Sequence, residues 1–130
     1  MCYRIGESYW DLGAQADLGY KRDTLEAMKW YSRAMVANPL NSRAWLQYGV
    51  CLDWLDRREE AGSYFDRANK LDPSDWYVTF CTGKHLVELD QLAKARDLFM
   101  LAYYRTAGAA MPMQYVKMVD SRLAEEAARK

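Results

Sequence analysis

Residues 42–75 read SRAWLQYGVCLDWLDRREEAGSYFDRANKLDPSD and contain two successive helical patterns. In the first, large apolar residues and a glycine share one helical face, at Trp45, Tyr48, Gly49 and Leu52. In the second, Ala61, Phe65 and Ala68 form a face with two small side chains and one ring. A glycine inside a helix costs about 1 kcal/mol, which a closely crossing partner helix would explain. The pattern predicts two antiparallel helices whose tightest contact is glycine against alanine.

The ends of these helices can also be predicted. Pro73 has no backbone N–H and disfavours helical structure at the residue before it, so the second helix should end at Asp72. Asn41 and Asp75 stand where the next helix needs a side chain that accepts a hydrogen bond from its first turn. These 34 residues therefore look like one complete helical hairpin followed by the start of another.

The same residue types recur with an offset of 34 residues. Pro73 follows Pro39 at this distance, and Gly83 follows Gly49. Three further series share the offset: Ala27, Ala61 and Ala95; Tyr31, Phe65 and Phe99; Ala34, Ala68 and Ala102. Independent series with one period indicate a solenoid of stacked repeats.

The residues quoted above follow the pattern Trp-x2-Leu-Gly-x2-Tyr, then Ala-x3-Phe, then Ala, then Pro. In this pattern the chain resembles the tetratricopeptide repeat (TPR) family. The central repeat fills every position of this pattern. The first repeat matches it at Tyr9, Leu12, Gly13, Ala16, Ala27, Tyr31, Ala34 and Pro39, with two extra residues in its turn. The third keeps Gly83, Leu86, Ala95, Phe99 and Ala102, but has Thr79, Thr82 and Ala107 at three consensus positions.

The resemblance implies an all-α fold, a right-handed superhelical α-solenoid of three helix hairpins. We expect one domain over residues 1–130, with repeats at about 6–41, 42–75 and 76–109. A further helix at about 112–128 has a narrow apolar stripe at Val116, Val119, Leu123 and Ala127, and should cap the last repeat. That makes seven helices. The N-terminal end has no equivalent cap, which suggests an excised piece of a longer protein or a partner at that end.

Composition excludes several functional classes. Lys and Arg number 18, as do Asp and Glu, so the net charge is zero and no basic excess indicates nucleic-acid binding. The sequence has no apolar stretch long enough to cross a bilayer and no N-terminal signal segment. We expect no direct membrane insertion. The compartment stays open: cytoplasmic, or periplasmic if the chain belongs to a larger membrane protein.

The few reactive side chains do not form a recognisable catalytic or metal site. Cys2, Cys51 and Cys81 are too few and too far apart for a disulfide framework, and His85 is the single histidine. Cys81 and His85 could touch across one helical turn, but no orienting acid or oxyanion hole accompanies them. We therefore expect Cys51 and Cys81 to be buried and inert and His85 to be a packing residue, with no metal, no cofactor and no enzymatic activity.

The resemblance implies a concave groove lined by the first helix of each repeat. The residues carried to that groove are Trp10, Ala14, Arg43, Leu46, Gln47, Val50, Trp54, Tyr77, Phe80, Cys81 and Lys84. One TPR subclass binds chaperone carboxylates with Lys, Asn, Asn, Lys and Arg at five such positions. Here these positions read Trp10, Ala14, Gln47, Tyr77 and Cys81, so no positive cluster remains and we reject that function.

The inferred groove is aromatic and aliphatic, which favours an apolar or amphipathic peptide or helix of a partner protein. For Trp10, Leu46 and Phe80, groove and core interpretations stay equally open, whereas Tyr31, Trp45, Phe65 and Phe99 should be core. The first hypothesis is a non-enzymatic interaction scaffold. The alternatives are an accessory domain, similar to TPR tails of bacterial membrane enzymes that polymerise or ligate surface polysaccharide, and a self-associating module, a homo-oligomer.

Overall fold

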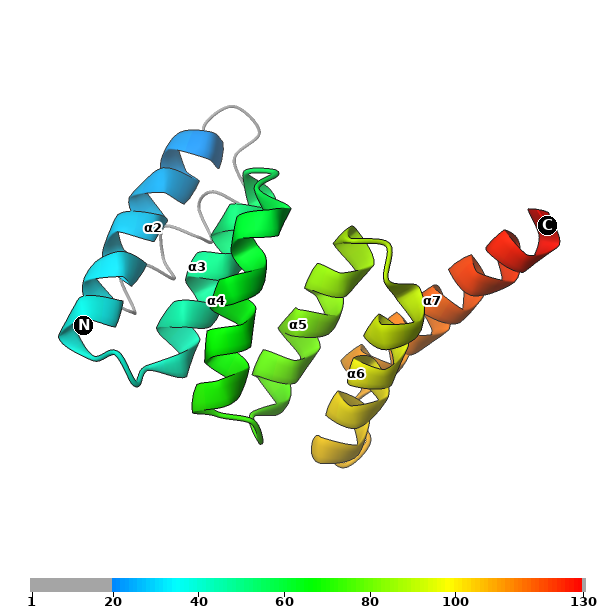
Figure 1. Ribbon diagram of the computed structural model, residues 1–130. Coiled ribbons are helices and arrows are strands. Elements are labelled where there is room, and N and C mark those ends of the chain that lie inside the picture. The colour runs from blue at the N-terminus through cyan, green and yellow to red at the C-terminus, as the bar shows by residue number, and fades with distance from the viewer. Residues whose placement is uncertain (1–19, 130) are drawn as a thin grey trace. The chain divides into compact units, whose positions relative to one another are not determined.

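The computed structural model describes residues 20–129, which form six helices and no strand (Figure 1). The helices are α2 (Tyr20–Ala37), α3 (Ser42–Trp54), α4 (Arg58–Leu71), α5 (Trp76–Glu88), α6 (Leu92–Arg105) and α7 (Ala110–Arg129). They divide into two compact units, one ending at Asp72 and the other beginning at Pro73. The predicted all-α helical repeat is thus confirmed. The predicted first helix and the N-terminal end lie outside the described residues.

In the first unit, α3 and α4 form a hairpin and α2 packs against α3. The helices α2 and α4 are the second helices of the first two repeats, and the residues that recur with the 34-residue period are buried on both. These residues are Ala27, Tyr31 and Ala34 on α2, and Ala61, Phe65 and Ala68 on α4. Leu46 and Leu52 of α3 complete this core. The stripes predicted from the 34-residue period are therefore the faces that pack.

In the second unit, α6 packs against both α5 and α7. Its core consists of Phe80, Leu92, Ala95, Phe99, Ala102, Val116 and Val119. Thr79, which departs from the repeat pattern, is also buried, and its Oγ1 accepts a hydrogen bond from Nη1 of Arg105 at 2.8 Å. In this repeat, a hydrogen bond therefore connects α5 and α6 at a position where the repeat pattern has a large apolar residue.

The predicted N-caps are confirmed. The Asn41 Oδ1 accepts from the backbone N–H of Ala44 at 3.3 Å, and the Asp75 Oδ1 accepts from that of Tyr77 at 2.9 Å. The helix α4 ends at Leu71, with Asp72 as its C-cap immediately before Pro73. Local residue chemistry therefore sets these boundaries.

The first helix of each described hairpin ends in a Schellman turn that the sequence did not reveal. Asp56 and Asp90, 34 residues apart, adopt φ values of 62° and 58°. The following N–H groups, of Arg57 and Gln91, donate back to the carbonyls of Leu52 and Leu86 at 2.8 and 2.9 Å. Glycine is the usual residue at such a position, which is why two aspartates gave no signal. The turns repeat with the same period as the side chains.

The expected contact of glycine with alanine is wrong. A Cβ added to Gly49 would lie 3.1 Å from Cε2 of Phe65 and 3.1 Å from Cβ of Tyr64, and one added to Gly83 would lie 2.8 Å from Cε1 of Phe99. The phenylalanine ring reaches further from its helix than an alanine methyl group does. The glycine therefore makes room for the ring of the opposite helix.

Two further expectations need correction. Trp45 is only half-buried, because its Nε1 donates to the carbonyl of Pro39 at 2.9 Å and keeps the indole at the rim of the core. The helix α7 begins at Ala110, two residues before the predicted start, and its predicted stripe is buried only at Val116 and Val119. Ala127 is exposed, since the last turns of α7 run past α6 (Figure 1).

Candidate functional site

The helix α3 carries five of the residues predicted to line a groove. Leu46 and Gln47 are buried, which for Leu46 favours the core interpretation. Arg43 and Val50 are half-buried. Trp54, at the C-terminal end of α3, keeps 45% of its surface exposed and is the largest accessible apolar side chain on this helix. Trp54 is therefore the residue of the first unit best placed to contact a partner.

The helix α5 carries the other four described residues of the prediction. Phe80 is only 2% exposed, and its ring contacts those of Phe99 and Tyr115, at centroid distances of 5.6 and 4.9 Å. The core interpretation therefore holds for Phe80. Cys81 is buried as well. Tyr77 is half-buried and Lys84 is exposed, so these two present the surface of α5.

Trp10 and Ala14 lie outside the described residues. They remain predictions, as does the first-repeat part of the groove.

The helix α7 contributes residues that were not among the predicted groove positions. Met111, Tyr115 and Met118 follow one another at i, i+4 and i+7 along one face of this helix. Met111 is 55% exposed, while Tyr115 and Met118 are half-buried against the core. This spacing was visible in the sequence, but the helix was interpreted only as a cap. We call Tyr77, Lys84, Met111, Tyr115 and Met118 the α5–α7 face.

Lys84 has an aromatic setting on this face. Its Nζ lies 5.8 Å from the ring centroid of Phe80 and 5.8 Å from that of Tyr115. Both distances are within the range of a cation–π interaction. The two rings come from different helices and contact each other. The ammonium group therefore marks the place where the surfaces of α5 and α7 join.

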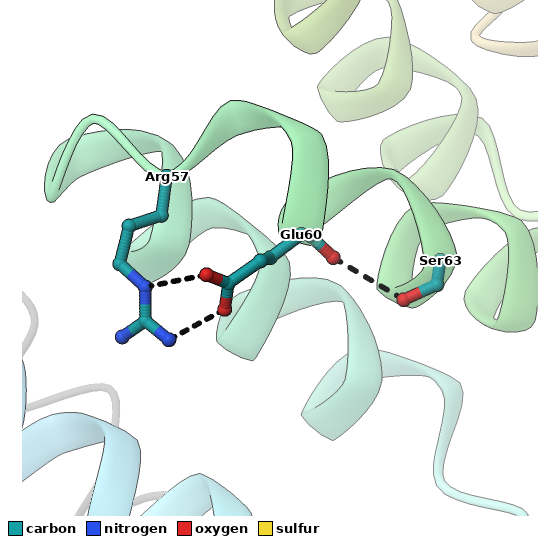
Figure 2. A network of polar contacts seen from close by, with 3 residues as sticks. All are labelled: Arg57, Glu60 and Ser63. Atoms are coloured by element: carbon teal, nitrogen blue, oxygen red, sulfur yellow. Dashed lines mark hydrogen bonds and ion pairs between the residues drawn. The ribbon is translucent and has the colours of Figure 1, made fainter.

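An open cleft of about 840 Å³ lies in the first unit, lined by basic residues of α2 and by Arg57. Two of its cations already have partners: Lys29 Nζ lies 2.9 Å from Glu26 Oε1, and the guanidinium of Arg33 lies 4.7 Å from the ring centroid of Trp30. Figure 2 shows the guanidinium of Arg57 paired with both carboxylate oxygens of Glu60, whose carbonyl accepts from Ser63. This cleft is therefore a poor candidate for an anion site.

The remaining reactive groups are buried. Burial raises the pKa of the Cys51 thiol well above its usual range, which disfavours the nucleophilic thiolate at neutral pH. Cys81 and His85 are also buried. Among residues 20–129, no three His, Cys, Asp or Glu side chains gather in a way that could hold a metal ion. None of the helices in that range is both long and apolar enough to span a membrane.

Comparisons with known proteins identify the repeat. Residues 42–75 match the family model of the tetratricopeptide repeat. A search of curated proteins finds no match.

Several solved structures of similar fold are TPR domains. The first TPR domain of human RPAP3 has a TM-score of 0.81 at 16% sequence identity, covering 99% of this chain and 94% of that one. The first TPR of Spaghetti (RPAP3), bound to an HSP90 peptide, has a TM-score of 0.78 at 18% identity, covering 95% and 90%. The Yersinia enterocolitica type III secretion chaperone SycD, with a peptide of the translocator YopD, has a TM-score of 0.71 at 18% identity, covering 99% and 92%.

At these identities the likeness establishes the fold alone, and the match of the family model establishes the repeat. Residues 42–75 are thus a tetratricopeptide repeat, and the chain has the fold of tetratricopeptide-repeat domains.

Proposed function

We propose that this chain is a non-enzymatic scaffold that binds an apolar or amphipathic segment of another protein through the first helices of its repeats. The observation that carries the proposal is the exposure of Trp54, which keeps 45% of its surface accessible at a predicted groove position. Proteins of the same fold support it, because Spaghetti was solved with an HSP90 peptide and SycD with a YopD peptide.

The type of ligand follows from the residues present. Gln47, Tyr77 and Cys81 stand at positions where the chaperone-binding subclass has an amide and two cations. A peptide carrying two terminal carboxylates would therefore find no matching charges at these positions. Trp54 and Tyr77 offer apolar area with few rotatable bonds, which suits an apolar side chain of the partner.

A selection experiment tests the proposal. The full chain would be used to select from a phage-displayed library of random twelve-residue peptides, and synthetic versions of the enriched peptides would be measured by calorimetry. Truncating an aromatic anchor at an interface typically costs about 2 kcal/mol, so Trp54→Ala should weaken binding by more than tenfold. Tyr77→Ala should weaken it in the same direction.

Val36→Ala is the matched control, because Val36 is 80% exposed at the end of α2 and is not a predicted groove residue. Its affinity should stay within about twofold of the parent chain. Folded Trp54→Ala and Tyr77→Ala variants that bind every selected peptide as tightly as the parent chain does would show that the groove assignment is wrong.

Self-association is a second candidate, and exposed apolar side chains outside the predicted groove favour it. Val36 and Leu40 are 80% and 73% exposed, and Tyr104 on α6 is 70% exposed. Apolar surface of this kind can pair with another copy. Sedimentation velocity over a hundredfold range of concentration would reveal a dimer, and a constant monomer would remove this candidate.

A further inference from the structure

We propose that the α5–α7 face recognises a peptide segment in which an Asp or Glu lies beside an apolar side chain, with Lys84 binding the carboxylate. The inference rests on the proposed function and specifies its ligand on the second unit. It differs from recognition by the chaperone-binding subclass. Here a single side-chain carboxylate is bound, and Lys84, which binds it, is not one of the five chaperone-binding positions.

The ammonium group of Lys84 carries the positive charge of this face. It is exposed, and within the described part of the chain its recorded contacts are with two aromatic rings and with no carboxylate. By contrast, Arg96, on the neighbouring helix α6, binds both carboxylate oxygens of Asp120, at 2.6 and 3.4 Å. Lys84 therefore keeps its charge available for an anion supplied by a partner.

The rings of Phe80 and Tyr115 hold this charge in place. Phe80 is 2% exposed and its ring packs against those of Phe99 and Tyr115, so the surface beneath the Lys84 ammonium group is held by the core. A lysine side chain normally loses considerable rotamer freedom when it binds. Contact with two rings restricts Lys84 before any ligand arrives, which lowers that cost. Lys94 on α6 is exposed too, but has no such ring contact among the described residues.

Tyrosine and methionine side chains form the α7 part of this face. The ring of Tyr115 lies beneath the Lys84 ammonium group, and Met111 and Met118 flank Tyr115 on the same face of α7. Methionine side chains adapt to apolar partners of different shape. A carboxylate placed on Lys84 would therefore bring its neighbouring side chain onto methionine and tyrosine. A leucine, methionine or phenylalanine beside the acid fits this surface.

The experiment compares peptide selections made with the parent chain, Lys84→Gln and Lys94→Gln. The probe is the same random twelve-residue phage library, followed by calorimetry of synthetic peptide pairs that differ by one Glu→Gln change. Selection on the parent chain should enrich Asp or Glu next to Leu, Met or Phe. The Glu→Gln change should weaken binding about fivefold, the upper range for an exposed ion pair.

The variants then locate the effect. In Lys84→Gln the Glu and Gln peptides should bind alike, whereas in Lys94→Gln the fivefold preference should persist. A preference that survives in Lys84→Gln overturns the inference. Enriched peptides without acids that still depend on Trp54 overturn the inference and leave the proposed function standing. If the parent chain enriches no peptide at all, both are wrong.

Discussion

Replacing Gly83 with alanine is expected to destabilise the second unit, although alanine favours a helix more than glycine does. The added Cβ would lie 2.8 Å from Cε1 of Phe99 and 3.0 Å from its Cδ1. Phe99 is fully buried, and its ring packs against Phe80 and Tyr115 with centroids 5.6 and 5.2 Å away. Because the ring is buried and packed against two others, admitting the methyl group requires the ring or the helices to shift.

Two opposing contributions set the magnitude. Alanine is better than glycine in a helix interior by about 1 kcal/mol, while overpacking a buried contact typically costs about 1–3 kcal/mol. We expect Gly83→Ala to lower the free energy of unfolding by about 1 kcal/mol. Gly49→Ala is the comparison, because its Cβ would lie 3.1 Å from its nearest neighbours and needs only a small shift. For that variant the two contributions should nearly cancel.

Urea unfolding followed by circular dichroism measures the free energy of unfolding of each variant. The double variant Gly83→Ala/Phe99→Leu gives an independent check, since a smaller side chain at position 99 removes the clash. In the Phe99→Leu background, the alanine should be neutral or stabilising. A Gly83→Ala chain that is about 1 kcal/mol more stable than the parent would refute the close glycine–ring contact.

Three further predictions concern the turns, a cap and the buried thiol. Asp90→Gly should raise the free energy of unfolding by about 0.5–1 kcal/mol, because Asp90 has a φ of 58° and glycine adopts this conformation without strain; urea unfolding checks it, and a loss would contradict it. Asp75→Ala should lower the free energy of unfolding by about 1 kcal/mol, because it removes the N-cap of α5. Asp75→Asn should retain most of this stabilisation, since asparagine is also a good N-cap. Burial raises the pKa of Cys51 above the ordinary value of 9.0. The protonated thiol therefore makes its full contribution to the free energy of unfolding below pH 9, and this contribution is lost as the pH rises above 9. The free energy of unfolding should therefore fall less steeply between pH 8 and 10 in Cys51→Ala than in the parent chain. Equal falls in the two proteins would contradict the burial of the Cys51 thiol.

The sequence predicted those features that depend on nearby residues. Asn41, Asp75 and Pro73 set helix ends through their own side chains, so their roles could be assigned from residue type and position. The 34-residue period likewise located buried residues such as Tyr31 and Phe99, since the face of a helix follows from spacing alone.

Features that depend on distant residues were missed or mistaken. The burial of Phe80 requires the ring of Tyr115, which lies on α7 and comes from a separate pattern in the sequence. The position of Trp45 at the rim depends on a hydrogen bond to the carbonyl of Pro39, a main-chain group that no residue pattern marks. The left-handed turns at Asp56 and Asp90 were hidden because aspartate there replaces the expected glycine.

The same limit applies to the candidate site. The family resemblance placed Phe80 and Lys84 on one helix face, but could not separate the buried ring from the exposed ammonium group. Only packing of α7 onto α5 and α6 makes that distinction, and it also brings Tyr115 beneath Lys84. The α5–α7 face is thus a property of the tertiary structure and not of any one repeat.

Chemical-shift mapping by NMR, with a peptide selected on the full chain, tests the proposed binding surface most directly. On titration, the largest changes should occur at the indole N–H of Trp54 and at amides around Tyr77, Lys84 and Tyr115. The amides around Leu101, an exposed residue of α6, should stay within experimental error. Changes confined to α4 and α6, with Trp54 and Tyr115 unaffected, would contradict binding through the first helices of the repeats.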